Sequence, residues 1–132
     1  METALPHLTF EYSANLDAVI DVNRLCSVVR RAMLDTGLFE IGAVRVRALR
    51  AGAYAIADEL EANSFIDASL RIGAGRSAED KARAGEAIFA AMTVFLEPLF
   101  ATPHFALSFE IREIDPALSW KKNAIHPRLR NK

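Results

Sequence analysis

The sequence predicts an α/β domain (α+β in some classifications) of two successive β-α-β units, forming a four-stranded sheet with two helices on one face. Four segments alternate apolar and polar residues with the period of half-buried strands, and two intervening segments carry apolar residues at helical spacing. The two halves have similar spacing, which indicates a structural duplication without obvious sequence identity. Each crossover is long enough to join parallel strands, and such connections are nearly always right-handed.

The first unit begins with the predicted strand 6–13 and continues into a helix. Pro6 stands at the first position of the strand, where proline is tolerated because it donates no ladder hydrogen bond. Asp21 can cap the helix, and Gly37 suits the position just past its C-terminus. The apolar stripe of this helix contains Val22, Leu25, Cys26, Val29, Ala32 and Met33.

The second predicted strand, 44–48, alternates so that Arg45 and Arg47 share one face. The less regular stretch 52–63 that follows is expected to be a loop or a short helix. Cys26 is interpreted as a small hydrophobic residue of the buried helix stripe. As the single cysteine of the chain, it excludes an internal disulfide framework.

The second unit starts with strand 65–72 and passes through the glycine-containing turn 73–76 into a helix. Ser77 is the expected N-cap, with Asp80 at capping-box spacing, and Pro98 is expected to limit or kink the helix. The buried stripe of this helix is predicted to contain Ala84, Ile88, Ala91 and Phe95.

The last predicted strand, 105–112, places its four large apolar side chains on one side. Every predicted strand therefore has one apolar and one polar face, so both helices should cover the same side of the sheet. The other side would be left for water or for neighbouring subunits, and it carries Thr9, Glu11, Ser69 and Ser108. A two-layer domain buries limited surface alone, which favours oligomerisation.

The composition excludes several classes of protein. A chain of 132 residues fits one domain, and a net charge of −1 gives no sign of a nucleic-acid-binding surface. No apolar run reaches the roughly 18 residues that a membrane span needs, and the N-terminus lacks a secretory signal pattern. His7, His104 and His126 lack metal-ligand spacing. We therefore expect a soluble, cytoplasmic protein without a metal site.

Basic residues cluster in the segments 45–50, 71–76 and 121–132, and the ordinary interpretation of each cluster is a solvated face. The turn 73–77 differs because it follows a strand and opens a helix, where backbone N–H groups bind anions. It lacks the third glycine of a dinucleotide fingerprint and the Gly-Lys-Ser/Thr ending of a P-loop. It can be a plain tight turn or an anion site that uses Arg76.

Short motifs follow one another in an informative order along almost the whole chain. They are Pro6-His7, Glu11–Leu16, Thr36-Gly37, Arg45, Ile72–Ser77, Leu107–Ile111 and Lys122–His126. In order and spacing the chain resembles the 5-carboxymethyl-2-hydroxymuconate isomerase family of the tautomerase superfamily. The resemblance implies a homotrimer of duplicated β-α-β subunits and an isomerase that requires neither a metal nor an organic cofactor.

The resemblance also implies roles for individual residues. Pro6 would be the general base and acid, provided that its ring nitrogen is a free secondary amine. Arg45 and Arg76 would bind carboxylates of a small polycarboxylate substrate, which guanidinium groups do bidentately. The implied reaction converts 5-carboxymethyl-2-hydroxymuconate to its keto isomer in aromatic-acid (homoprotocatechuate) catabolism. Two alternatives stay open: another keto–enol isomerase of the superfamily acting on a smaller acid, and a non-catalytic trimeric carboxylate-binding protein.

Residues 1–5 form an N-terminal extension to a single domain spanning 6–132. In the sequence as written the nitrogen of Pro6 is an amide, and we expect protein that keeps the extension to be poorly active. Translation could start at Leu5 if its codon is TTG or CTG, which can serve as start codons. Alternatively, proteolysis could expose Pro6, or the protein could use the fold without the chemistry.

Overall fold

The computed structural model describes residues 6–131, so the expected extension 1–5 lies outside the described residues. The strands are β1 (His7–Ser13), β2 (Arg45–Ala51), β3 (Ser64–Gly73) and β4 (Phe105–Ile114). The α-helices are α1 (Val22–Asp35), α2 (Ala78–Phe95), α3 (Glu97–Phe100) and α4 (Ile125–Arg130). Short 3-10 helices are η1 (Ala14–Ala18), η2 (Ile41–Ala43) and η3 (Pro116–Leu118).

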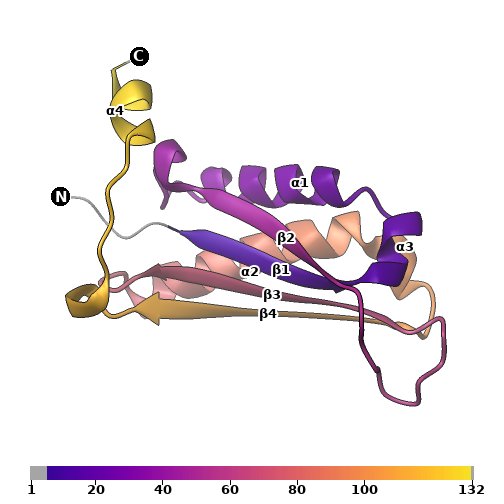
Figure 1. The fold of residues 1–132 in the computed structure, drawn as a ribbon. Coiled ribbons are helices and arrows are strands. Elements are labelled where there is room, and N and C mark those ends of the chain that lie inside the picture. The colour runs from indigo at the N-terminus through magenta and orange to yellow at the C-terminus, as the bar shows by residue number, and fades with distance from the viewer. Residues whose placement is uncertain (1–5, 132) are drawn as a thin grey trace.

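The strands form one four-stranded sheet in the order β2-β1-β3-β4. β1 pairs in parallel with β2, and β3 pairs in parallel with β4, so each β-α-β unit contributes two adjacent strands. The two units meet where β1 pairs antiparallel with β3. α1 and α2 cover the same face of the sheet (Figure 1). The predicted fold class is confirmed.

Local sequence signals account for the helix boundaries. The Asp21 carboxylate accepts a hydrogen bond from the Arg24 backbone N–H at 3.0 Å, and the Ser77 hydroxyl accepts one from the Asp80 N–H, also at 3.0 Å. Both predicted N-caps are confirmed, and each satisfies one of the free N–H groups of a first turn. After α1, Gly37 adopts a φ of +74°, a left-handed conformation that glycine takes without strain.

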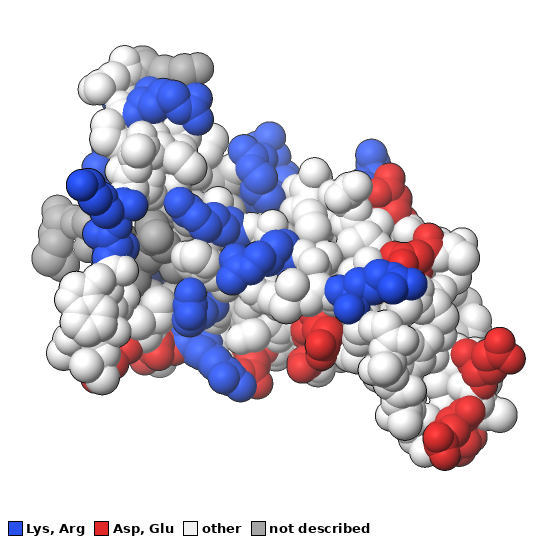
Figure 2. Space-filling view, in the orientation of Figure 1, with Lys and Arg blue, Asp and Glu red and all other residues white. Residues whose placement is uncertain are grey.

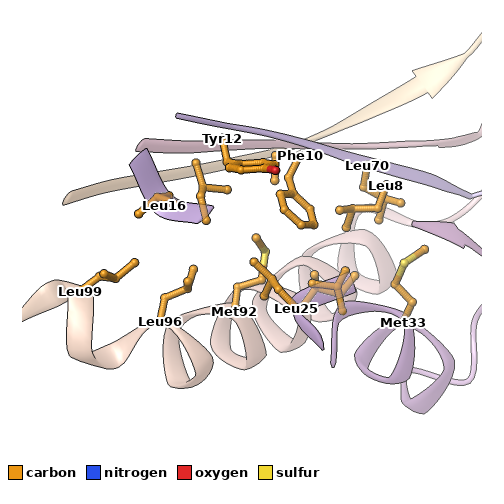
Figure 3. Packing of buried hydrophobic residues seen from close by; sticks show 14 of the residues in the cluster. Leu8, Phe10, Tyr12, Leu16, Leu25, Met33, Leu70, Met92, Leu96 and Leu99 are labelled. Carbon is orange, nitrogen blue, oxygen red and sulfur yellow. The ribbon is translucent and has the colours of Figure 1, made fainter. Parts of the chain in front are cut away.

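The hydrophobic core lies between the sheet and the two long helices (Figure 3). From β1, Leu8 and Phe10 are completely buried, and they face the predicted α1 stripe. The centre of the α2 stripe differs from the prediction, because Met92 is buried whereas Ala91 is only half-buried. The buried residues of α2 are spaced four apart, at Ala84, Ile88 and Met92.

The stretch 52–63 is an irregular loop that projects beyond the end of the sheet between β2 and β3 (Figure 1). The Asn63 side chain, at the end of this loop, ties the loop together by donating to the Ile56 carbonyl at 3.1 Å and to the Asp58 carboxylate at 2.8 Å. α2 ends at Phe95, and Pro98 lies in the first turn of α3, so the expected effect of this proline is confirmed.

Candidate functional site

Strand register brings the predicted site residues to one end of the sheet, where β1 begins. The Arg45 backbone N–H, at the start of β2, donates to the Pro6 carbonyl at 3.2 Å. Because β3 runs antiparallel to β1, its last residue, Gly73, lies at this same end. The turn that carries Arg76 follows directly. The structure thus places Pro6, which is buried, beside both arginine-bearing segments.

The Arg45 side chain folds back onto the segment that precedes its own strand. Its Nη1 donates to the Ala43 carbonyl at 2.8 Å and to the Gly42 carbonyl at 3.4 Å. The guanidinium is therefore held by the backbone of η2 through one of its terminal nitrogens. Arg45 is half-buried, a setting in which charge interactions are stronger than in bulk water.

Arg76 reaches the same connecting segment from the turn between β3 and α2. Its Nη2 donates to the Leu38 carbonyl at 3.1 Å, and its guanidinium carbon lies 5.0 Å from the centre of the Phe39 ring. Its Nη1 is buried, and among residues 6–131 it has no hydrogen-bond partner. An unsatisfied buried donor is costly, and a carboxylate oxygen is the acceptor that best satisfies a guanidinium.

We call residues 38–43 the anchor segment, because their carbonyls hold both guanidiniums. The C-terminal part of the chain packs on this segment. The Asn123 side-chain amide donates to the Gly42 carbonyl at 3.1 Å, and α4 contacts η2. His126 is buried here, 2% exposed.

Glu40 ties the anchor segment to α4 by ionic contacts. Arg130 forms a two-point ion pair with the Glu40 carboxylate, one contact being 2.7 Å, and His126 Nδ1 lies 3.3 Å from the same group. Hydrogen bonding from Arg130 lowers the pKa of Glu40, and the nearby His126 contributes in the same direction. The basic C-terminal cluster is therefore more than the solvated face expected from the sequence, because Arg130 has a specific partner.

A row of basic residues crosses the open face of the sheet at this end. Arg45, His7, Arg71 and Arg112 are direct neighbours across the four strands. Figure 2 shows positive side chains gathered over this end, whereas negative ones lie along the lower edge and toward the opposite end of the molecule. Burial lowers the pKa of His7, and Arg71, Arg47 and Arg45 lower it further.

Beside this row lies a cavity of about 500 Å³. His7 and Arg71 line it from the sheet, and Trp120, Lys121 and Lys122 line it from the chain after β4. We call it the Trp120 cavity. Sequence reasoning missed it, although the alternation of β1 and β3 already placed His7 and Arg71 on the open face.

The basic clusters of the sequence are redistributed in space. Arg50, grouped with Arg45 in the sequence, lies toward the other end of β2 and pairs with Asp17 at 2.6 Å. Arg71 and Arg76 diverge: the first lies on the open face, and the second contacts the anchor segment.

Within residues 6–131 no group of three His, Cys, Asp or Glu side chains could hold a metal, and no described helix is long and apolar enough to cross a bilayer.

Comparisons with known proteins agree on one family. The model of the 5-carboxymethyl-2-hydroxymuconate isomerase family matches residues 6–129. The 5-carboxymethyl-2-hydroxymuconate Delta-isomerase of Escherichia coli is 33% identical over 122 residues, which cover 92% of this chain and 97% of that protein.

Solved structures extend the similarity to the fold. A 5-carboxymethyl-2-hydroxymuconate isomerase from Deinococcus radiodurans R1 is 39% identical, with a TM-score of 0.89 over 96% of this chain and 95% of that chain. A fused 4-OT protein, described as a symmetric trimer, shares the fold at 13% identity, with a TM-score of 0.62 over 88% of this chain and 93% of that chain. The resemblance seen in the motifs, and the expectation of an isomerase, are confirmed. The chain belongs to the 5-carboxymethyl-2-hydroxymuconate isomerase family.

Proposed function

We propose that this protein converts 5-carboxymethyl-2-hydroxymuconate to its keto isomer, with Pro6 as the base and Arg45 and Arg76 as carboxylate-binding residues. The observation that carries the proposal is that the anchor segment holds the guanidiniums of Arg45 and Arg76 at the sheet end where β1 begins, and that Arg76 has a buried nitrogen without a partner among residues 6–131. The names of the E. coli and D. radiodurans relatives support the substrate.

The proposed reaction moves one proton and one pair of π electrons along a conjugated dienol. The Pro6 nitrogen removes the proton of the 2-hydroxyl group, so the O–H bond breaks and a C=O bond forms. The electron pair shifts along the chain, and the protonated Pro6 returns its proton to a carbon further along it. One O–H bond is exchanged for one C–H bond, and no oxidant or reductant takes part.

The arginines would act on both the substrate and the base. Their guanidiniums neutralise the carboxylates and stabilise the negative charge that develops as the hydroxyl proton leaves. Positive charge also lowers the pKa of a nearby amine and so increases its free-base fraction near neutral pH. The lowered pKa of His7, the residue next to Pro6, is consistent with such a field, since Arg71, Arg47 and Arg45 all contribute to it.

The base requires Pro6 to be the first residue of the mature protein. We expect a chain that begins at Pro6 to exceed the full chain 1–132 in kcat/KM by roughly 100-fold or more, the range of general acid–base catalysis. A Pro6→Ala variant of the shorter chain is the control and should lose most of this gain. Equal turnover by the two chain lengths would refute a free-proline mechanism. Mass spectrometry of the natural N-terminus shows which form the cell makes.

The carboxylate contacts are tested with Arg76. Arg76→Ala should lower kcat/KM by ~10- to 100-fold, the value of a charge-assisted hydrogen bond, with little change in folding. Arg83→Ala is the matched control, because Arg83 is an exposed arginine on α2 whose contacts are with Thr36 and Asp80. Unchanged kinetics in Arg76→Ala would remove this residue from the site.

We also propose that the protein is a homotrimer. The fused 4-OT protein of the same fold is a symmetric trimer, and the open face of the sheet beyond the basic row, where Leu49 of β2 is 52% exposed, is available for subunit contacts. Light scattering after gel filtration should give three times the chain mass of 14.5 kDa. A monomer at working concentrations would contradict the proposal.

A second candidate function is a non-catalytic carboxylate-binding protein. The observation that favours it is the amide nitrogen of Pro6 in the sequence as written. Protein isolated from its native cell with residues 1–5 intact, binding the substrate without turning it over, would support this candidate over the isomerase.

A further inference from the structure

The proposed substrate carries more negative charge than the two predicted arginines can match. Its muconate chain has a carboxylate at each end, and the carboxymethyl group at C5 adds a third. Arg45 and Arg76 can each bind one carboxylate. A third carboxylate left without a cation in a partly desolvated site would be costly, so a third positive subsite is required.

We propose that the Trp120 cavity is this subsite, and that Arg71, Lys121 and Lys122 bind the carboxymethyl carboxylate and so select tricarboxylates over dicarboxylates. This inference rests on the proposed function. It concerns only specificity, and a test of it does not depend on catalysis.

The position of the cavity suits a substrate that lies against Pro6. His7 lines the cavity and directly follows Pro6 in the chain. Arg71 faces His7 across the β1–β3 ladder, and Arg45 faces it from β2. The cavity therefore opens at the sheet end that holds the predicted base and the first carboxylate-binding arginine. Its volume of about 500 Å³ is within the range of small-molecule sites.

The charge of the cavity suits an anion. Arg71, Lys121 and Lys122 form no ion pair with any carboxylate in residues 6–131, and no described Asp or Glu lines the cavity. The next arginine in the row behaves differently, since Arg112 pairs with Glu110. The lowered pKa of His7, to which Arg71 contributes after burial, agrees with an uncompensated positive field.

The cavity also has an apolar wall that is exposed to solvent. The Trp120 side chain is 84% exposed and Leu118 is 69% exposed, and both line the cavity. Large exposed apolar side chains beside convergent polar groups are typical of ligand sites. The methylene of the carboxymethyl group can contact this wall while its carboxylate reaches the cations.

The test compares two saturated acids that cannot isomerise. Pentane-1,2,5-tricarboxylate has the three carboxylates of the substrate in the same relative positions, and adipate lacks the carboxymethyl group. Calorimetry with the full chain 1–132 should show a preference for the tricarboxylate of ~10- to 100-fold, the value of one or two charge-assisted contacts. Arg71→Gln, and separately Lys121→Gln with Lys122→Gln, should reduce this preference by at least about fivefold and leave adipate binding unchanged.

Arg112→Gln is the matched control, because Arg112 is the cross-strand neighbour of Arg71 but lies outside the cavity lining. It should keep both affinities. The proposal is overturned if wild-type protein binds the two acids equally or binds neither, or if Arg71→Gln weakens both alike. A different result would overturn the proposed function alone: a chain beginning at Pro6 that still prefers the tricarboxylate to adipate but does not isomerise the substrate.

A second measurement needs no variant and so does not depend on whether one folds. His7 lines the cavity, so its NMR resonances should shift on saturation with the tricarboxylate and shift much less with adipate. Unchanged His7 resonances at saturating tricarboxylate would contradict the assignment of the cavity.

Discussion

Replacing Gly42 by alanine would disturb the contact that joins the C-terminal helix to the anchor segment. Gly42 is buried in η2, directly against His126 of α4. A Cβ at this position would lie 2.7 Å from His126 Nδ1, 3.1 Å from its Cα and 3.2 Å from its backbone nitrogen. Two of these three atoms are backbone, so rotation of the imidazole alone cannot relieve the overlap. η2 and α4 must move apart.

The expected cost follows from two opposing effects. Forcing an extra carbon into a packed contact costs about 1–3 kcal/mol, while restricting the unfolded chain by Gly→Ala returns about 0.4–1 kcal/mol. The net loss of unfolding free energy is about 1–2 kcal/mol, which lowers Tm by roughly 3–8 °C for a domain of this size. Because the Gly42 carbonyl accepts hydrogen bonds from Arg45 and Asn123, KM should rise as well.

Thermal unfolding and steady-state kinetics measure the two effects, and Gly85→Ala is the matched control. Gly85 lies within α2, and a Cβ there meets only the Ile111 Cδ1 atom, at 3.2 Å. That atom ends a flexible side chain, and alanine favours the helix by about 1 kcal/mol over glycine, so Tm should stay equal or rise. A Gly42→Ala protein as stable as wild type, or a Gly85→Ala protein equally destabilised, would refute the packing argument.

Three further predictions concern a cap, an ion pair and a titration. Asp21→Ala should lower the unfolding free energy by about 1 kcal/mol in urea titrations, whereas Asp35→Ala should change it little because its ion pair with Arg31 is exposed. Arg130 lowers the folded-state pKa of Glu40, so its stabilisation is present above the unfolded-state pKa and is lost as pH falls through the lower folded value. Urea unfolding should therefore show wild type more stable than Glu40→Gln at pH 7 and the two converging below about pH 4, and a constant difference would contradict this. NMR titration should give His7 a pKa below about 6.5, and Arg71→Gln should raise this pKa only in part, since burial is the larger cause. If the pKa of His7 did not rise in Arg71→Gln, Arg71 would not be acting on His7.

The sequence alone determined the four strands, the two long helices and the apolar face of each strand. Alternation over a few residues identifies each strand and its apolar side, and a side-chain oxygen three residues before a free N–H identifies each cap, as at Asp21 and Ser77. These signals are local because the hydrogen bonds and side-chain directions that cause them involve neighbouring residues. The ordered motifs also pointed to the family that the comparisons confirmed.

The tertiary structure decided which remote residues meet. Only the antiparallel pairing of β1 with β3 brings Arg71 beside His7, and only the packing of α4 on η2 gives Arg130 its partner Glu40. Neither contact can be predicted from a few consecutive residues of the sequence, because its free energy depends on strand register and on the joint packing of distant segments. For the same reason the sequence placed Arg45 and Arg50 in one cluster. The folded chain places Arg45 against the anchor segment and Arg50 against Asp17, toward opposite ends of one strand.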